Sequence, residues 1–123
     1  MNGEYAFGVQ IHLEPQSPAV RLEPAVVETR CLLTAPTPGE EGWLFFRDHC
    51  WRGEIRDERP VRELLEEHLG HTVVGVELRG LHVDEAYREA LEAEIAADLN
   101  AFRADSIGEV VSKYLGSRLE VEH

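Results

Sequence analysis

The chain begins with a regular alternation of apolar and polar positions. Between residues 5 and 13 every second side chain is large and apolar, and the side chains between them are small or polar. A period of two is typical of a strand with one buried face and one solvated face. Residues 26–34 alternate in the same way and predict a second strand, which a segment containing Pro15 and Pro18 separates from the first.

The apolar run at residues 43–46, WLFF, is continuous instead of alternating. Such a run is typical of a strand that is covered on both faces, so we predict a central strand here. Polar and charged side chains follow at once in residues 47–54. Their pattern fits two structures equally well, a turn into a second short strand or a helical turn.

The second half of the chain changes to helical spacing. Residues 60–69 place apolar side chains on one face of a helix, with Pro60 at its first position and Gly70 as its C-terminal cap. Residues 72–79 return to the period of two and predict another strand.

Two further helices are predicted near the C-terminus. Residues 84–102 form one apolar stripe at helical spacing, and Asp84 is a suitable N-cap for it. Residues 107–115 predict a last, shorter helix. Its ends are marked by a capping-box pair and a closing glycine: Ser106, Glu109 and Gly116.

These elements follow the order β-β-β-α-β-α-α. Strands first and helices late predict an α+β fold, with a mostly antiparallel sheet of about four strands and two to three helices packed on one face. The tail after Gly116 fits either a frayed end or a short edge strand. With 123 residues and no internal repeat or boundary, residues 1–123 are predicted to form a single domain.

The charge balance changes the picture of the surface. There are 24 acidic and 12 basic residues, a net charge of −12, and Lys113 is the single lysine. So negative a surface repels nucleic-acid phosphates, so no nucleic-acid partner is expected. Molar salt shortens the Debye length to about 3 Å and screens such self-repulsion. We therefore expect that the protein comes from a halophile and that salt stabilises its fold.

Location and redox state follow from simple absences in the sequence. No apolar run approaches the roughly 18 residues that a membrane helix needs. The N-terminus lacks the basic start and apolar core of a signal peptide, so we expect a cytoplasmic protein with no membrane contact. The two cysteines, Cys31 and Cys50, are then expected to be reduced, small and buried.

The sequence lacks the common enzyme and cofactor motifs. The six histidines form no zinc spacing, and no GxGxxG, Walker-type or GxSxG motif occurs, so no metal, cofactor or catalytic residue is predicted. Asp48, His49 and Cys50 are residue types that thiol chemistry uses. A nucleophilic cysteine needs a base or cation near its sulfur, and adjacent residues of a strand point apart.

A cluster of arginines is the strongest candidate for a site. Five fall within sixteen residues and make residues 47–62 net positive, whereas every other long stretch is negative. Arginine beside tryptophan can stack on the ring or bind a carboxylate or phosphate through two hydrogen bonds. The candidate binding residues are Arg47, Trp51, Arg52 and Arg56. The alternative is a network of ion pairs that ties the central strand to the helices.

The large indole of Trp51 is expected to be buried. Arg52 would then emerge at the edge of the core, with a carboxylate or aromatic side chain as its fixed partner.

Three segments together resemble a known family. GWLFFRDHCWRGE, DEAYREALEAEIAADLNAF and VVSKYLG are similar to the LWR-salt proteins of halophilic archaea, and the resemblance spans nearly the whole chain. The family is named for a Leu-Trp-Arg motif, and this chain has Cys50-Trp51-Arg52 at that position. The resemblance implies no catalytic residues and agrees with the expectation of a salt-rich environment.

Together these patterns predict a small, non-catalytic binding or interaction module that uses the region of Trp51 and Arg52. Its partner would be a protein or a small anion. Two alternatives from other classes stay open. One is a small thiol- or acid/base-dependent enzyme, which a depressed pKa of Cys50 would favour, and the other is a structural homodimer subunit in place of a monomer.

Overall fold

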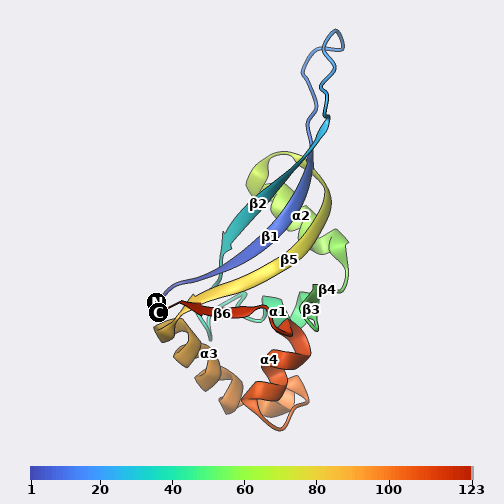
Figure 1. The fold of residues 1–123 in the computed structure, drawn as a ribbon. Coiled ribbons are helices and arrows are strands. Elements are labelled where there is room, and N and C mark those ends of the chain that lie inside the picture. The colour runs from blue at the N-terminus through green and yellow to red at the C-terminus, as the bar shows by residue number, and fades with distance from the viewer. Residues whose placement is uncertain (123) are drawn as a thin grey trace.

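The protein is built around a four-stranded sheet in a computed structural model that describes residues 1–122. Its strands lie in the order β2-β1-β5-β6, and only the pair β5–β6 is parallel (Figure 1). The strands are β1 (Gly3–His12), β2 (Val26–Thr34), β5 (Thr72–Asp84) and β6 (Leu119–Glu122). The predicted α+β fold with a mostly antiparallel sheet is confirmed, and residues 119–122 of the tail form an edge strand.

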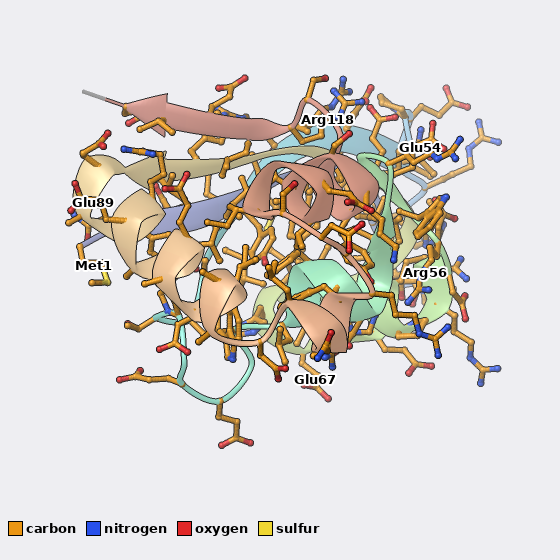
Figure 2. The ribbon with its side chains drawn as sticks, turned by 90° about the horizontal axis from the view of Figure 1, so that it is seen from below. Met1, Glu54, Arg56, Glu67, Glu89 and Arg118 are labelled. Carbon is orange, nitrogen blue, oxygen red and sulfur yellow. The ribbon has the colours of Figure 1, made fainter. Side chains whose placement is uncertain are left out.

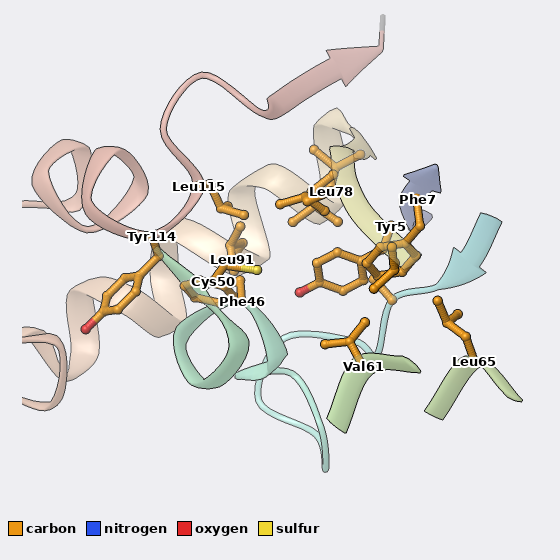
Figure 3. Packing of buried hydrophobic residues seen from close by; sticks show 14 of the residues in the cluster. Tyr5, Phe7, Phe46, Cys50, Val61, Leu65, Leu78, Leu91, Tyr114 and Leu115 are labelled. Carbon is orange, nitrogen blue, oxygen red and sulfur yellow. The ribbon is translucent and has the colours of Figure 1, made fainter. Parts of the chain in front are cut away.

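The apolar side chains of the first strand face the core, as their alternation with polar side chains predicts. Tyr5, Phe7, Val9 and Ile11 of β1 are all buried, and they meet the helices in one hydrophobic core (Figure 3). The helical elements are α1 (Phe45–His49), α2 (Glu58–Leu69), α3 (Glu85–Ala97), the 3-10 turn η1 (Leu99–Phe102) and α4 (Ile107–Leu115). In Figure 1, α2 lies along the middle of the sheet, whereas α3 and α4 gather at the end where both termini lie.

The predicted central strand at residues 43–46 is wrong. Residues 43 and 44 belong to a turn, and α1 begins at Phe45. Trp43 and Phe46, three residues apart, both contact the ring of Phe102, whereas Phe45 contacts Tyr5 on the sheet. A short apolar run can be covered on two sides as a helical turn as well as a strand, and no side chain in it is exposed.

Other boundaries differ in smaller ways. The segment 47–54 contains both alternatives, the end of α1 and a short hairpin formed by β3 (Cys50–Trp51) and β4 (Glu54–Ile55). Within residues 1–122 the added elements give four α-helices where two or three were expected, in an order that inserts α1, β3 and β4 before α2. The helix predicted to reach residue 102 ends at Ala97, because Asp98 leaves the helical conformation with φ −149°.

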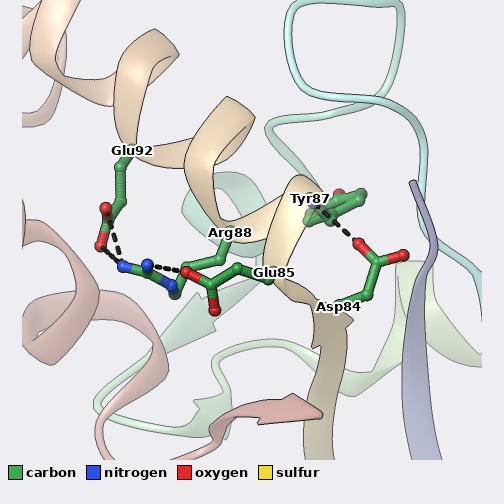
Figure 4. Close-up of polar contacts among 5 residues, drawn as sticks. All are labelled: Asp84, Glu85, Tyr87, Arg88 and Glu92. Carbon is green, nitrogen blue, oxygen red and sulfur yellow. Dashed lines mark hydrogen bonds and ion pairs between the residues drawn. The ribbon is translucent and has the colours of Figure 1, made fainter. Parts of the chain in front are cut away.

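Most local capping signals are confirmed, but α2 begins at Glu58 with Asp57 as its N-cap, so Pro60 is the third residue of this helix and not the first. Asp84 accepts a hydrogen bond from the backbone N–H of Tyr87 at 2.8 Å (Figure 4). Gly70 ends α2 in the left-handed conformation. Ser106 accepts from Glu109 N–H at 3.1 Å, whereas the Glu109 carboxylate accepts from Asp105 N–H.

The acidic face of α3 is partly compensated within the helix itself. The Arg88 guanidinium lies between Glu85 and Glu92 and binds both carboxylates (Figure 4). None of the helices in residues 1–122 has the length and apolar character needed to cross a membrane.

Candidate functional site

The strands β3 and β4 are joined by the shortest loop that a hairpin commonly uses. Arg52 and Gly53 connect them, and both have positive φ angles, 53° and 85°. These angles are those of a type I′ turn, whose twist matches the twist of paired strands. Arginine seldom adopts a positive φ, so other contacts must hold this turn. We call Trp51, Arg52 and Gly53 the hairpin tip.

The contacts that hold the hairpin tip come from the end of α4. The backbone N–H of Arg52 donates to the carbonyl oxygen of Lys113 at 2.8 Å, and that of Gly53 donates to Tyr114 at 3.0 Å. These carbonyls belong to the last turn of α4, where no partner exists within the helix. The approach is close, since a Cβ on Gly116 would lie 2.9 Å from the Arg52 carbonyl oxygen. The tip therefore acts as a cap for α4.

The side chains of the hairpin tip face outward. Trp51 is 40% exposed, which corrects the expectation that it is buried. The guanidinium carbon of Arg52 lies 5.7 Å from the centre of the Trp51 ring, and the Lys113 amine lies 5.9 Å from it. Arg52 thus has the aromatic partner that was predicted, and two cations lie close to one exposed indole.

A shallow hollow of about 540 Å³ opens at this place. Trp51 and Arg52 line it together with residues of α4, which are Glu109, Ser112, Lys113 and Gly116. The Lys113 amine also donates to the carbonyl oxygen of Phe102 at 2.8 Å, so its position is fixed by the backbone. With two cations and one carboxylate, the residues that line the hollow have a positive net charge, although the protein as a whole is acidic.

The other two candidate residues lie beside α1. The Arg56 guanidinium donates to the carbonyl oxygens of Asp48, at 2.7 Å, and Arg47, at 3.3 Å. Arg47 itself binds the Asp48 carboxylate at 3.1 Å. The structure therefore divides the predicted set into Trp51 and Arg52 at the tip, and Arg47 and Arg56 in polar contacts that stabilise the fold. Figure 2 shows Arg56 and Glu54 at one end of the molecule, with Glu89 at the other.

The neighbouring thiol has an apolar environment. Cys50 is fully buried in the core, and this burial raises the pKa of its thiol to about 12, although Arg56 acts in the opposite direction (Figure 3). The thiol is therefore protonated at neutral pH and lacks thiolate character. Within residues 1–122, no group of three or more His, Cys, Asp or Glu side chains could hold a metal ion.

Lys113 is the site residue that sequence reasoning missed. A signal was present, because it is the one lysine of an acidic chain and stands three residues before the glycine that closes α4. Nothing in the sequence, however, placed that turn of α4 next to Trp51.

A comparison with protein families decides the chain's relationship. The model of the LWR-salt protein family matches residues 1–123. The chain belongs to this family. No curated protein and no solved structure matches it significantly. In this LWR-salt protein, the Trp-Arg pair occupies the tip of a hairpin that caps the last helix.

Proposed function

We propose that this LWR-salt protein is a non-catalytic binding module that takes an anionic group, on a small molecule or on a partner protein, at the hairpin tip. One observation carries the proposal: Arg52 and Lys113 both lie close to the ring of the exposed Trp51, and all three residues line one hollow. A guanidinium can bind a carboxylate or phosphate through two hydrogen bonds. The indole supplies a rigid apolar surface beside it.

The surroundings of the tip support an anionic ligand. The protein as a whole has a net charge of −12, whereas the charged residues that line this hollow are two cations, Arg52 and Lys113, and one carboxylate, Glu109. An anionic ligand near these two cations would be attracted to them. The protonated thiol of Cys50 argues against the alternative of a thiol-dependent enzyme.

Binding at the tip can be measured with Trp51 as the probe. In a Trp43→Phe background Trp51 is the single tryptophan, and its fluorescence can be followed during titration with inorganic phosphate or with an acidic peptide. The ionic strength is kept constant with KCl. We expect saturable quenching, and at least about tenfold weaker binding in Arg52→Asn, because a charge-assisted hydrogen bond is lost.

The choice of asparagine keeps the experiment interpretable. Asn tolerates positive φ and precedes Gly in the preferred type I′ turn, so the variant keeps the fold of the tip while losing the guanidinium. Arg21→Asn, on an exposed arginine distant in sequence, is the control for the change in charge. A Trp51 signal that responds to neither probe, or equal affinity in Arg52→Asn and the control, contradicts the proposal.

We also propose that the protein works in the cytoplasm of a halophile. The support is the acid excess and the single lysine, together with unpaired acids on α3 that Arg88 cannot neutralise. Their repulsion acts over about 10 Å at 0.1 M salt and about 3 Å at 1 M. The melting temperature should therefore rise through the molar range of KCl, and with choline chloride as well if screening is the cause. A flat or falling melting temperature removes this part of the proposal.

A further inference from the structure

The outer edge of β2 is a long strand edge without a partner in residues 1–122. β2 stands at one end of the sheet order, and its nine residues pair with β1 in an unbroken register from Val26 to Thr34 (Figure 1). The opposite edge is different, since β6 has only four residues and carries Glu120 and Glu122. Short or charged edges resist pairing with other chains, whereas long regular edges invite it.

The hydrogen-bonding pattern shows which backbone groups β2 presents outward. On either side of the ladder, Leu13 N–H donates to Ala25 at 2.7 Å and Ala35 N–H donates to Gly3 at 2.8 Å. Antiparallel pairs alternate between bonded and non-bonded positions. The odd residues of β2 therefore bond to β1, and the even residues direct N–H and C=O away from the sheet: Val26, Glu28, Arg30 and Leu32.

The side chains of this edge carry few of the features that prevent pairing with another strand. β2 contains no proline or lysine, and no bulge interrupts its pairing with β1. Val26 is 43% exposed and Leu32 is 51% exposed. Between them stand one acid and one base, Glu28 and Arg30, so the sequence of exposed side chains is apolar, negative, positive, apolar.

We propose that a second copy of this chain pairs with β2 along this edge, antiparallel, around a two-fold axis at Thr29. The outward-facing residues then match without conflict. Glu28 lies opposite the partner's Arg30, and Val26 lies opposite the partner's Leu32. The two-fold axis repeats each pair, which is the self-complementary pattern that a symmetric dimer requires. Opposite charges and aliphatic pairs across strands both stabilise a sheet.

Neighbouring registers are disfavoured by charge. The outward-facing residues all have even numbers and must pair with one another. The two-fold axis therefore always passes through a residue position, and the smallest change of register moves it to the next residue. An axis at Arg30 places two arginines opposite each other, and an axis at Glu28 does the same with two glutamates. Like charges directly opposite destabilise a pair of strands. The sequence Glu28-Thr29-Arg30 therefore selects the axis at Thr29.

An apolar hollow beside the edge fits the same partner. It has a volume of about 520 Å³, and Leu32 and Leu33 of β2 line it together with Phe45 and Leu64. In the proposed register the partner's Val27 lies opposite Cys31, next to this hollow. The second copy would thus cover apolar surface on the helix side of the sheet as well as extend the sheet to eight strands, twice the four of one chain.

A charge-swap cycle tests both the dimer and its register. Sedimentation equilibrium at about 0.5 M KCl, where the Debye length is roughly 4 Å, gives the dissociation constant. Glu28→Arg and Arg30→Glu each place like charges opposite each other twice, so each should weaken the dimer roughly tenfold or more. The double variant Glu28→Arg/Arg30→Glu exchanges the two charges and should restore the affinity. Glu89→Arg, on α3, makes the same charge change away from the edge and should leave it unchanged.

Cross-linking supplies a second measurement that does not depend on charge. Thr29 would form a non-hydrogen-bonded pair with the partner's Thr29, about 4.5 Å apart between Cα atoms, which a disulfide can span. Thr29→Cys/Cys31→Ser should therefore form a covalent dimer under mild oxidation. In Val27→Cys/Cys31→Ser the two new cysteines would lie roughly 13 Å apart and should stay free.

The results of these experiments distinguish the proposed dimer from a monomer and from a dimer formed through another surface. A dimer whose affinity falls in the single variants and returns in the double variant, with cross-linking at position 29 alone, supports the proposal. A protein that stays monomeric up to roughly 0.1 mM, far above a micromolar dissociation constant, overturns it. So does a dimer that the charge swaps leave unchanged. Thermal melts of each variant establish that loss of the dimer is not loss of the fold.

Discussion

Residues 46–56 have two parts, an inner part that contains Phe46, Cys50 and Arg56, and the hairpin tip. Similar side chains have different roles in these two parts. In the inner part, Phe46 and Cys50 are buried, and Arg56 binds backbone carbonyls of α1. At the tip, Trp51 and Arg52 lie at the surface and contact each other. Two arginines four residues apart thus have different roles, because one meets unsatisfied carbonyl groups and the other meets an exposed ring.

The difference teaches that an arginine cluster is not a site by itself. Where an arginine finds backbone acceptors, its donors are used and little is left for a ligand. Where its neighbour is an exposed tryptophan on a turn fixed by backbone hydrogen bonds, the guanidinium keeps donors for an anion. Five predictions test this contrast, from the largest expected effect to the smallest.

Truncation of an inner aromatic should have the largest effect. Phe46→Ala removes a ring that stacks on Phe102 and leaves a cavity in the core, so we expect a loss of about 3–5 kcal/mol in the free energy of unfolding. Trp51→Ala should lose only about 1–2 kcal/mol, because the ring is partly exposed and no closed cavity forms. Urea unfolding measures both. Equal losses would break the contrast between the inner part and the tip.

Loss of the inner arginine should have a moderate effect. Arg56→Gln removes charge-assisted hydrogen bonds to the carbonyls of Arg47 and Asp48, and we expect a loss of about 1–2 kcal/mol because the side chain is solvated as well. Chemical denaturation provides the value. Phosphate affinity at the tip should be unchanged in this variant, and a selective loss of binding with intact stability would place Arg56 in the site instead.

The buried thiol gives a pH-dependent test of the inner part. The folded pKa of Cys50, about 12, lies above the unfolded value of about 8.5. Its contribution to stability is therefore complete below the unfolded pKa and is lost as pH rises toward the folded pKa. The free energy of unfolding should fall with alkaline pH, less steeply in Cys50→Ala than in the wild type. In Cys50→Ala a residual dependence of the free energy of unfolding on pH should remain, because burial also raises the pKa of Tyr87 to about 12.

The same thiol can be checked by chemistry at lower pH. A thiol reagent at pH 8 should modify Cys31, which is half-buried, well before Cys50. Rapid modification of Cys50 would mean that the inner part opens readily or that its thiolate is stabilised, and either result would revive the thiol-enzyme alternative.

The smallest stability change is expected at the tip. Arg52→Asn should alter the free energy of unfolding by no more than about 0.5 kcal/mol, because Asn suits the positive φ of 53° and the backbone bond to Lys113 is kept. Thermal unfolding with and without phosphate separates the two roles of the residue. A large loss of stability would show that Arg52 belongs with the inner arginines.

Local signals in the sequence determined much of the fold. The alternation in β1 and β2, the caps Asp84 and Gly70, and the α+β order of strands and helices were all read from neighbouring residues. These features depend on side-chain periodicity and on bonds within one turn of the chain, so the information lies in a few adjacent positions.

Tertiary structure decided the features on which function depends. The run at residues 43–46 is short enough for either a strand or a helical turn, and distant rings at Tyr5 and Phe102 select the turn. Likewise, only the docking of the tip on α4 brings Lys113 beside Trp51. Burial depends on which surfaces meet, and those surfaces come from residues far apart in the chain.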